Sequence, residues 1–171
     1  INASNSEGTQ RTLDIASWGL IPSWSKDGTR QASTINARVE SVAEKPSFRS
    51  AFKSRRCLVP ANGYYEWATE VGAFKPKQPF YISNENGSLL SMAGLYEQWA
   101  NPQTGELVNT VTVITRESVG RIAKVHHRMP VLLPMDRWSH WLSSDPIDST
   151  PVSEYLDLLD VQEPDLSLIH I

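Results

Sequence analysis

The pattern of apolar and polar residues predicts β-strands along the middle of the chain. Several stretches are rich in β-branched and aromatic residues and are separated by Gly, Asn and Pro, which is typical of strands joined by turns. We expect strands at 57–59, 64–67, 79–82, 89–99, 110–115 and 129–133. Residues 18–24, in which Gly and Pro interrupt aromatic residues, predict a short strand followed by a turn.

Helical spacing is confined to short segments. Phe48 and Phe52 lie four residues apart after Pro46, which predicts a short amphipathic helix with a basic outer face. Further short helices are expected at 117–125, 134–142 and 151–159. We therefore predict an α+β fold built on curved antiparallel β-sheets, barrel-like, with a few short flanking helices.

The length and composition predict one soluble domain. The 171 residues, 40% of them hydrophobic and 20% charged, suffice for a single core. We assign residues 1–160 to this domain and expect its N-terminal portion to be missing, because Ile1 is not an initiator methionine. Residues 161–171 are expected to be a disordered or non-native tail. The chain has neither an apolar run long enough for a membrane span nor a signal-like start, so we expect a monomer inside the cell.

The single cysteine and the few histidines argue against a structural metal. Cys57 alone can form neither an internal disulfide nor a cysteine-rich zinc site, and the four histidines do not occur in a His-Glu-x-x-His pattern. We expect no metal and no cofactor. Cys57 has apolar neighbours and is expected to behave as a small buried hydrophobe. A nucleophilic role stays open, because Arg55 and Arg56 would lower its pKa if it were exposed.

The net charge of −3 hides an uneven distribution. Residues 1–135 hold 15 Lys/Arg against 11 Asp/Glu, a net charge of +4, whereas residues 136–171 hold 1 against 8, a net charge of −7. The segment 45–56 contains five cations and no acid, and 116–128 contains four cations and one acid. Such clusters can neutralise phosphates, although a solvated helix face has the same composition.

Glu66 and His126 are candidates for proton transfer. Glu66 lies between Tyr65 and Trp67, and burial there would raise the pKa of its carboxyl toward neutral pH; the alternative is an edge-strand glutamate in water. His126 and His127 stand where a helix is predicted to end and a strand to begin. In an extended chain only one of them faces a given pocket, and the alternative is a histidine that compensates a helix dipole.

Polar and aromatic residues elsewhere suit binding of an unpaired nucleic acid. Asn36 and Arg38 share one face of a predicted strand and offer an amide beside a guanidinium, although a turn asparagine with a surface arginine looks the same. Trp24 and Trp67 are candidate stacking platforms for unpaired bases, and Trp18 is assigned to the core.

The order and spacing of these motifs resemble the SRAP (SOS response-associated peptidase) domain family. The resemblance covers roughly residues 18–142. It rests on WGLIPSW, NARVE, FRSAFKSRRCLVPANGYYEW, MAGLYEQW, VTVITRES, HHRMPVLL and RWSHWL, in that order.

The resemblance implies a domain that binds single-stranded DNA and covalently traps abasic sites in the DNA damage response, with peptidase (hydrolase) and lyase-like chemistry. In the family the nucleophile is a cysteine directly after the initiator methionine, which autopeptidase activity exposes. Its amine and thiol condense with the sugar aldehyde to a thiazolidine. The protein would be cytoplasmic or nucleoid-associated in a bacterium and nuclear in a eukaryote.

The resemblance also implies roles for residues of this chain. Asn36 would orient the cysteine and the substrate, Glu66 would move protons, and His126 would act as acid or base near the sugar oxygen. The implied DNA-binding residues are Trp24, Arg38, Trp67, Thr115 and Arg128. The family's Met-Cys-Gly-Arg start does not occur in the 171 residues, so we expect this fragment to be inactive by itself. Two alternatives remain: a non-catalytic single-stranded DNA-binding module, and a cysteine protease that uses Cys57 and His126.

Overall fold

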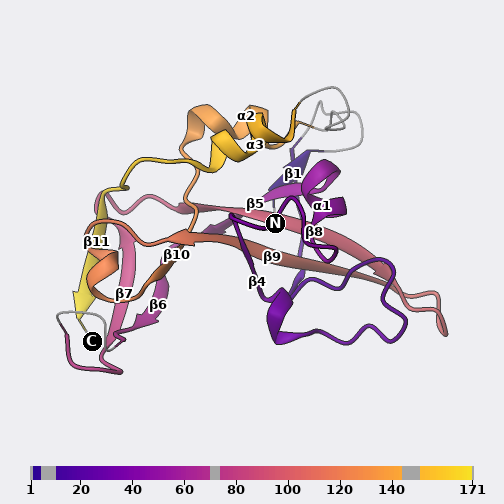
Figure 1. The fold of residues 1–171 in the computed structure, drawn as a ribbon, viewed down its shortest axis with the longest axis horizontal. Coiled ribbons are helices and arrows are strands. Elements are labelled where there is room, and N and C mark those ends of the chain that lie inside the picture. The colour runs from indigo at the N-terminus through magenta and orange to yellow at the C-terminus, as the bar shows by residue number, and fades with distance from the viewer. Residues whose placement is uncertain (1, 5–10, 70–73, 144–150, 171) are drawn as a thin grey trace.

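A computed structural model describes residues 2–4, 11–69, 74–143 and 151–170, which form two β-sheets with helices on one side (Figure 1). The larger sheet follows the order β10-β9-β8-β5-β1-β2, with β3 and β4 also pairing with β9, and the smaller sheet follows the order β11-β7-β6. The larger sheet contains β1 (Asn2–Ser4), β2 (Arg11–Leu13), β3 (Ser17–Trp18), β4 (Asn36–Arg38), β5 (Arg56–Ala61), β8 (Leu90–Ala100), β9 (Leu107–Glu117) and β10 (Arg128–Pro130). The smaller sheet contains β6 (Tyr64–Trp67), β7 (Pro79–Asn84) and β11 (Leu166–His170).

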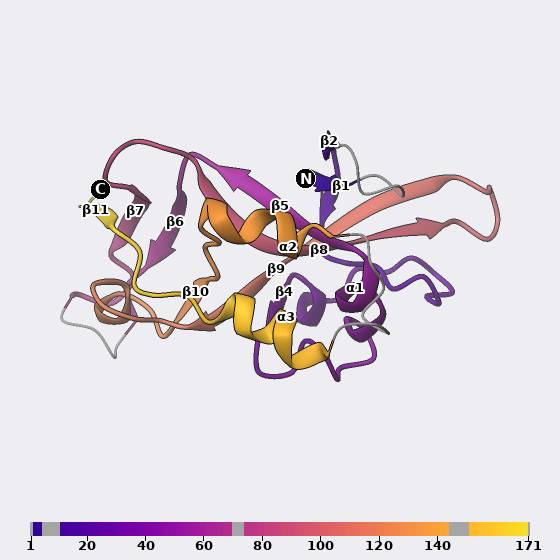
Figure 2. The ribbon, with the colours of Figure 1, turned by 90° about the horizontal axis from the view of Figure 1, so that it is seen from above.

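The helical elements are short. The α-helices are α1 (Arg49–Ser54), α2 (Trp138–Trp141) and α3 (Val152–Leu159), and the 3₁₀ turns are η1 (Ala32–Thr34), η2 (Ile122–Lys124) and η3 (Met135–Arg137). Seen from above, α2 and α3 lie over the larger sheet (Figure 2). No helix among the described residues is long and apolar enough to span a membrane.

Strand β9 organises the larger sheet. It pairs antiparallel with β8 and β10 and parallel with β3 and β4. Thr115 on β9 is the register partner both of Arg38 on β4 and of Pro130 on β10. Segments that are about 90 residues apart in the sequence therefore meet on the two sides of one β9 residue.

The core has two main parts. One lies between the helices and the larger sheet, where Phe48, Phe52, Trp141, Tyr155 and Leu159 are each at most 1% exposed. The other lies where the two sheets meet, and it includes Phe80, Ile82, Leu90, Met92, Val125 and Met129. Burial of a large apolar side chain contributes roughly 1.5–3 kcal/mol, so these clusters hold the sheets in place.

Arg56 is a buried cation that joins two helix ends. Its guanidinium donates hydrogen bonds to the carbonyl oxygens of Phe52, Lys53, Trp141 and Ser143, and it lies 4.1 Å from the ring centroid of Tyr155. These carbonyls belong to the last turn of α1 and to the C-terminal end of α2. The last carbonyls of a helix have no partner within it, and the partial negative charge there favours a cation.

The predicted α+β class is confirmed, and the strands 57–59, 64–67, 79–82, 89–99 and 110–115 overlap β5 to β9. In the described part of the chain the larger sheet stays open instead of closing into a barrel. The helix predicted at 117–125 is wrong. Strand β9 continues to Glu117, and Gly120 adopts a φ of +54°, which an α-helix does not accommodate, so only η2 forms.

The expected disorder of the tail is corrected for the residues that the structure describes. Leu166–His170 forms β11, which pairs with β7 along five register positions, and Leu166 is 4% exposed. The alternation of Leu166 and Leu168, which pack against the second core cluster, explains the pairing.

Candidate functional site

One cavity collects residues from all three motif segments that the sequence singles out. It has a volume of about 450 Å³, and Asn36, Glu66 and His126 all line it. Thr115 and Arg128 line it as well. Its floor is apolar and includes Val59, Met92, Val111, Val113 and Met129. An apolar floor lowers the local dielectric constant, which strengthens the electrostatic interactions of the polar residues around it.

Strand β6 presents Glu66 to the cavity. Exposure alternates along the strand, so that Tyr64 and Glu66 are half-buried while Tyr65 and Trp67 are exposed. Gly63, just before the strand, has no room for a side chain, because a Cβ there would lie 2.5 Å from the Ile82 carbonyl oxygen. The backbone of β6 can therefore approach β7 closely. Glu66 Oε1 accepts a hydrogen bond of 3.2 Å from the backbone N–H of Trp67.

Tyr64 is a cavity residue that the sequence-based prediction missed. Its hydroxyl is buried and has no hydrogen-bond partner among the described residues. Burial, and secondarily the charge of Glu66, raises the pKa of this phenol, so it stays neutral and keeps its proton to donate. The strand alternation that places Tyr64 on the same face as Glu66 was the signal that could have found it.

His126 lies between η2 and β10 and faces Glu66. Its Nδ1 is 3.8 Å from Glu66 Oε2, and the backbone N–H of Arg128 donates to the same nitrogen at 3.1 Å. The same nitrogen lies 3.0 Å from the Arg128 carbonyl oxygen, to which a protonated Nδ1 would donate, so these contacts are compatible with a proton on either ring nitrogen. His127 is exposed, and its ring packs against that of His126 with centroids 4.4 Å apart and planes inclined at 40°. The two rings lie side by side, whereas an extended chain would direct them apart.

Strand β4 places Asn36 and Arg38 on one face. Both are exposed, whereas Ala37 between them is 0% exposed. Asn36 lines the cavity, but Arg38 does not. Thr115 is 9% exposed, and its hydroxyl donates to the Ala37 carbonyl oxygen, which ties β4 to β9 beside the cavity.

Arg128 is held by Glu40. Its guanidinium donates to both carboxylate oxygens of Glu40, at 2.6 and 3.0 Å, and to the Thr115 carbonyl oxygen at 2.7 Å. The hydrogen bond from Arg128 keeps the pKa of the Glu40 carboxyl below its ordinary value of 4.5. An anion that binds Arg128 must therefore compete with Glu40 for the guanidinium.

The Glu40–Arg128 pair gives a testable pH dependence. Because the pKa of Glu40 is lower in the folded state, the stabilisation is complete above about pH 4.5 and is lost as the pH falls through the folded-state pKa. The Glu40 side chain is 53% exposed, so we expect Glu40→Gln to destabilise the protein by only about 1 kcal/mol or less at pH 7. Urea unfolding measures the free energy of unfolding of both proteins. If the difference between the unsubstituted protein and Glu40→Gln grows below pH 4.5, the pair does not stabilise the fold in this way.

The three tryptophans singled out in the sequence are all exposed. Trp24 is 65% and Trp67 53% exposed, and neither lines the cavity. Assigning Trp18 to the core is wrong, since it is 58% exposed and forms part of the cavity wall. Its indole N–H donates to the Ile35 carbonyl oxygen at 2.8 Å, which anchors one end of the ring and leaves the rest accessible. The apolar residues next to Trp18 in the sequence do not show whether its side chain is buried in the core or lines a cavity.

Cys57 is buried, as its sequence context predicts. It is 0% exposed, and burial raises the pKa of its thiol to about 12. A thiol is nucleophilic as the thiolate, so a buried cysteine with a raised pKa is unreactive. Cys57 also does not line the cavity that contains His126, which argues against the protease alternative.

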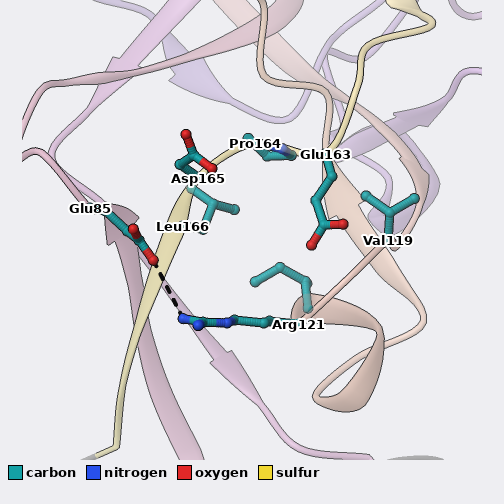
Figure 3. A pocket seen from close by; sticks show the side chains of 8 residues that line it. Glu85, Val119, Arg121, Glu163, Pro164, Asp165 and Leu166 are labelled. Atoms are coloured by element: carbon teal, nitrogen blue, oxygen red, sulfur yellow. Dashed lines mark hydrogen bonds and ion pairs between the residues drawn. The ribbon is translucent and has the colours of Figure 1, made fainter.

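A second cavity, of about 390 Å³, lies near the start of β11 (Figure 3). Its charged residues are Glu85, Glu163, Asp165 and Arg121, and Arg121 pairs with Glu85 at 3.4 Å. Three carboxylates against one guanidinium repel phosphate groups. Among the described residues, no three His, Cys, Asp or Glu side chains are arranged to hold a metal ion.

Comparison with known proteins places this chain in a family. Residues 1–170 match the family described as SOS response associated peptidase (SRAP), and the chain belongs to this family. A protein of known structure from Bacteroides thetaiotaomicron superposes with a TM-score of 0.78 at 35% identity, over 90% of this chain and 67% of that one.

Two relatives of similar sequence are named abasic site processing proteins. The chain is 39% identical to the abasic site processing protein YoaM of Bacillus subtilis, over 90% of this chain and 64% of the relative. It is 32% identical to the abasic site processing protein HMCES of Pongo abelii, over 81% of this chain and 47% of the relative. The chain thus spans about half to two thirds of the length of these relatives.

Proposed function

We propose that the chain carries the substrate-binding part of an abasic site processing protein, which binds single-stranded DNA and traps abasic sites covalently. The observation that carries the proposal is the cavity in which Asn36, Glu66 and His126 meet, although they come from three separate segments. The family name and the names of the relatives support abasic DNA as the substrate. The nucleophile is the cysteine that follows the initiator methionine in this family, and it is outside these 171 residues.

The proposed reaction has two condensation steps. The cysteine amine attacks the sugar aldehyde and water leaves to give an imine; the thiol then adds to the imine carbon and closes a thiazolidine. Both steps move protons, which requires a donor and an acceptor at the same site. Glu66 takes and returns the amine protons, and His126 donates a ring proton to the sugar oxygen as the ring opens. Asn36 orients the amine and the substrate through its amide.

The proposed DNA contacts include two residues that line the cavity, Thr115 and Arg128, and three that do not. Arg38 and Arg128 bind phosphates, Thr115 forms a hydrogen bond at the lesion, and Trp24 and Trp67 stack on flanking bases. The exposure of both indoles supports the stacking role, since stacking on an aromatic side chain contributes roughly 1–3 kcal/mol per base. Arg128 can bind a phosphate only when the phosphate displaces the Glu40 carboxylate from its guanidinium.

The absence of an adduct with the chain alone is the first expected result. Incubated with an oligonucleotide that contains an abasic site, the chain is expected to bind weakly and to form no covalent product, because its one cysteine is buried. The same chain preceded by the family's Met-Cys-Gly-Arg start is expected to form an adduct on a denaturing gel. A Cys57→Ser variant serves as the control in both forms. An adduct of the chain alone that Cys57→Ser abolishes would instead assign the nucleophile to Cys57.

A further inference from the structure

A third cavity adjoins the proposed active site. It has a volume of about 550 Å³, and its lining includes Ser33, Asn36, Arg38, Ser41 and Lys45. We call it the Lys45 cavity. Asn36 lines both this cavity and the one that contains Glu66 and His126, so the two are neighbours across a single side chain. A ligand that occupies the Glu66–His126 cavity can therefore extend into the Lys45 cavity.

The Lys45 cavity is cationic. Its lining has two positive charges, Arg38 and Lys45, and no acidic residue. The nearest acids in the sequence are Glu40 and Glu44, and neither lines it; the Glu40 carboxylate is already bound by Arg128. Both side chains are exposed, and neither side chain makes a hydrogen bond or an ion pair with a residue that the structure describes. The charge of Arg38 contributes to the lowered pKa of Glu40.

The backbone around Lys45 is ordered and positions its side chain. The Lys45 N–H donates to the Ser41 carbonyl oxygen, and the Lys45 carbonyl oxygen accepts from the N–H groups of Phe48 and Arg49. The ammonium group lies 5.5 Å from the centroid of the Phe48 ring, which is buried in the core. A cation placed over a ring has fewer conformations to lose when it binds an anion.

We propose that the Lys45 cavity binds the phosphodiester next to the abasic nucleotide, with Lys45 and Arg38 neutralising the phosphate and the Ser41 hydroxyl donating a hydrogen bond to one of its oxygens. The inference rests on the proposed function, because it assumes that DNA occupies the neighbouring cavity. It adds a binding residue, Lys45, and a direction: the strand leaves the active site past Asn36. The volume lies within the roughly 300–1,000 Å³ of ordinary ligand sites.

Salt-dependent DNA binding tests the role of Lys45. The chain, a Lys45→Gln variant and a Lys53→Gln variant are titrated by fluorescence anisotropy against a single-stranded oligonucleotide that carries a stable abasic analogue, from low to moderate salt. Lys53→Gln is the matched control, because it removes the same charge from an exposed residue that lines neither cavity. Loss of one phosphate contact is expected to weaken binding about three- to tenfold and to reduce the slope of log K against log salt by about 0.7. Lys53→Gln is expected to change the slope by much less.

Neutral linkages locate the contact. Methylphosphonates are placed one at a time on either side of the abasic analogue. One of them is expected to weaken binding by the unsubstituted chain more than binding by Lys45→Gln, because the variant has already lost the Lys45 contact and loses only the Arg38 contact. Equal behaviour of Lys45→Gln and Lys53→Gln, or an equal loss from Lys45→Gln with every linkage, overturns the inference and leaves the proposed function standing. No binding of single-stranded DNA by the unsubstituted chain overturns both.

Discussion

Replacing Arg56 by alanine is expected to destabilise the fold by at least about 3 kcal/mol, a large part of the roughly 5–15 kcal/mol that holds a domain folded. The guanidinium is 3% exposed and donates to four carbonyl oxygens at the ends of α1 and α2. Its removal deletes these four hydrogen bonds, and each buried group that is left unpaired costs roughly 1–3 kcal/mol before relaxation. It also removes the planar group that packs against Tyr155 and leaves a cavity there.

Urea unfolding or a thermal melt measures the effect, with a fall in Tm of about 6–12 °C expected for a chain of this size. Arg49→Ala is the matched control. Arg49 is the first residue of α1, the helix whose last carbonyls Arg56 binds; it is exposed, and its side chain forms no hydrogen bond or ion pair among the described residues. Arg56→Lys keeps the charge but loses the planar fork of donors, and we expect an intermediate loss. If Arg56→Ala and Arg49→Ala unfold within about 1 kcal/mol of each other, Arg56 does not join the helix ends in the way described.

The strands were predictable from sequence because their signal is local. The alternating exposure of Tyr64–Trp67 and the β-branched run of β9 identify the strands without knowledge of their neighbours. The parallel pairing of β3 and β4 with β9 has no such signal, since it depends on contacts across more than 70 residues. The helix predicted at 117–125 failed for a related reason. Its apolar spacing is compatible with a helix, but pairing with β10 extends β9 to Glu117.

The candidate site shows the same division. Motif resemblance named Asn36, Glu66 and His126, and the structure adds that they line one cavity with Tyr64 and Trp18. The sequence could not show that Glu40 binds Arg128, because the two are 88 residues apart and only the pairing of β4 and β10 with β9 brings them together. It also could not show that Arg38 faces the Lys45 cavity rather than the first one.

Glu66→Gln is expected to have the largest effect on the proposed chemistry. In the chain preceded by the family's Met-Cys-Gly-Arg start, we expect adduct formation to slow by about 10²- to 10⁴-fold, the usual contribution of a positioned acid or base. Glutamine keeps the size and the hydrogen-bonding ability of the side chain but can neither take a proton nor face His126 as an anion at 3.8 Å. Affinity for single-stranded DNA is expected to stay the same or rise slightly, because a negative charge leaves the binding surface.

The comparison of rate with affinity separates the two remaining functions. Glu106→Gln, at the exposed end of the β8–β9 hairpin, removes the same charge far from the cavity and should change neither quantity. The adduct is followed over time on a denaturing gel, and binding is followed by anisotropy with a stable abasic analogue. A slow Glu66→Gln variant that still binds places the carboxylate in the chemistry. If Glu66→Gln forms the adduct as fast as Glu106→Gln does, Glu66 has no role in proton transfer. Another group then transfers the protons, and Glu66 only fixes the end of β6. Binding of single-stranded DNA without any adduct, even with Glu66 in place, would instead support the non-catalytic module.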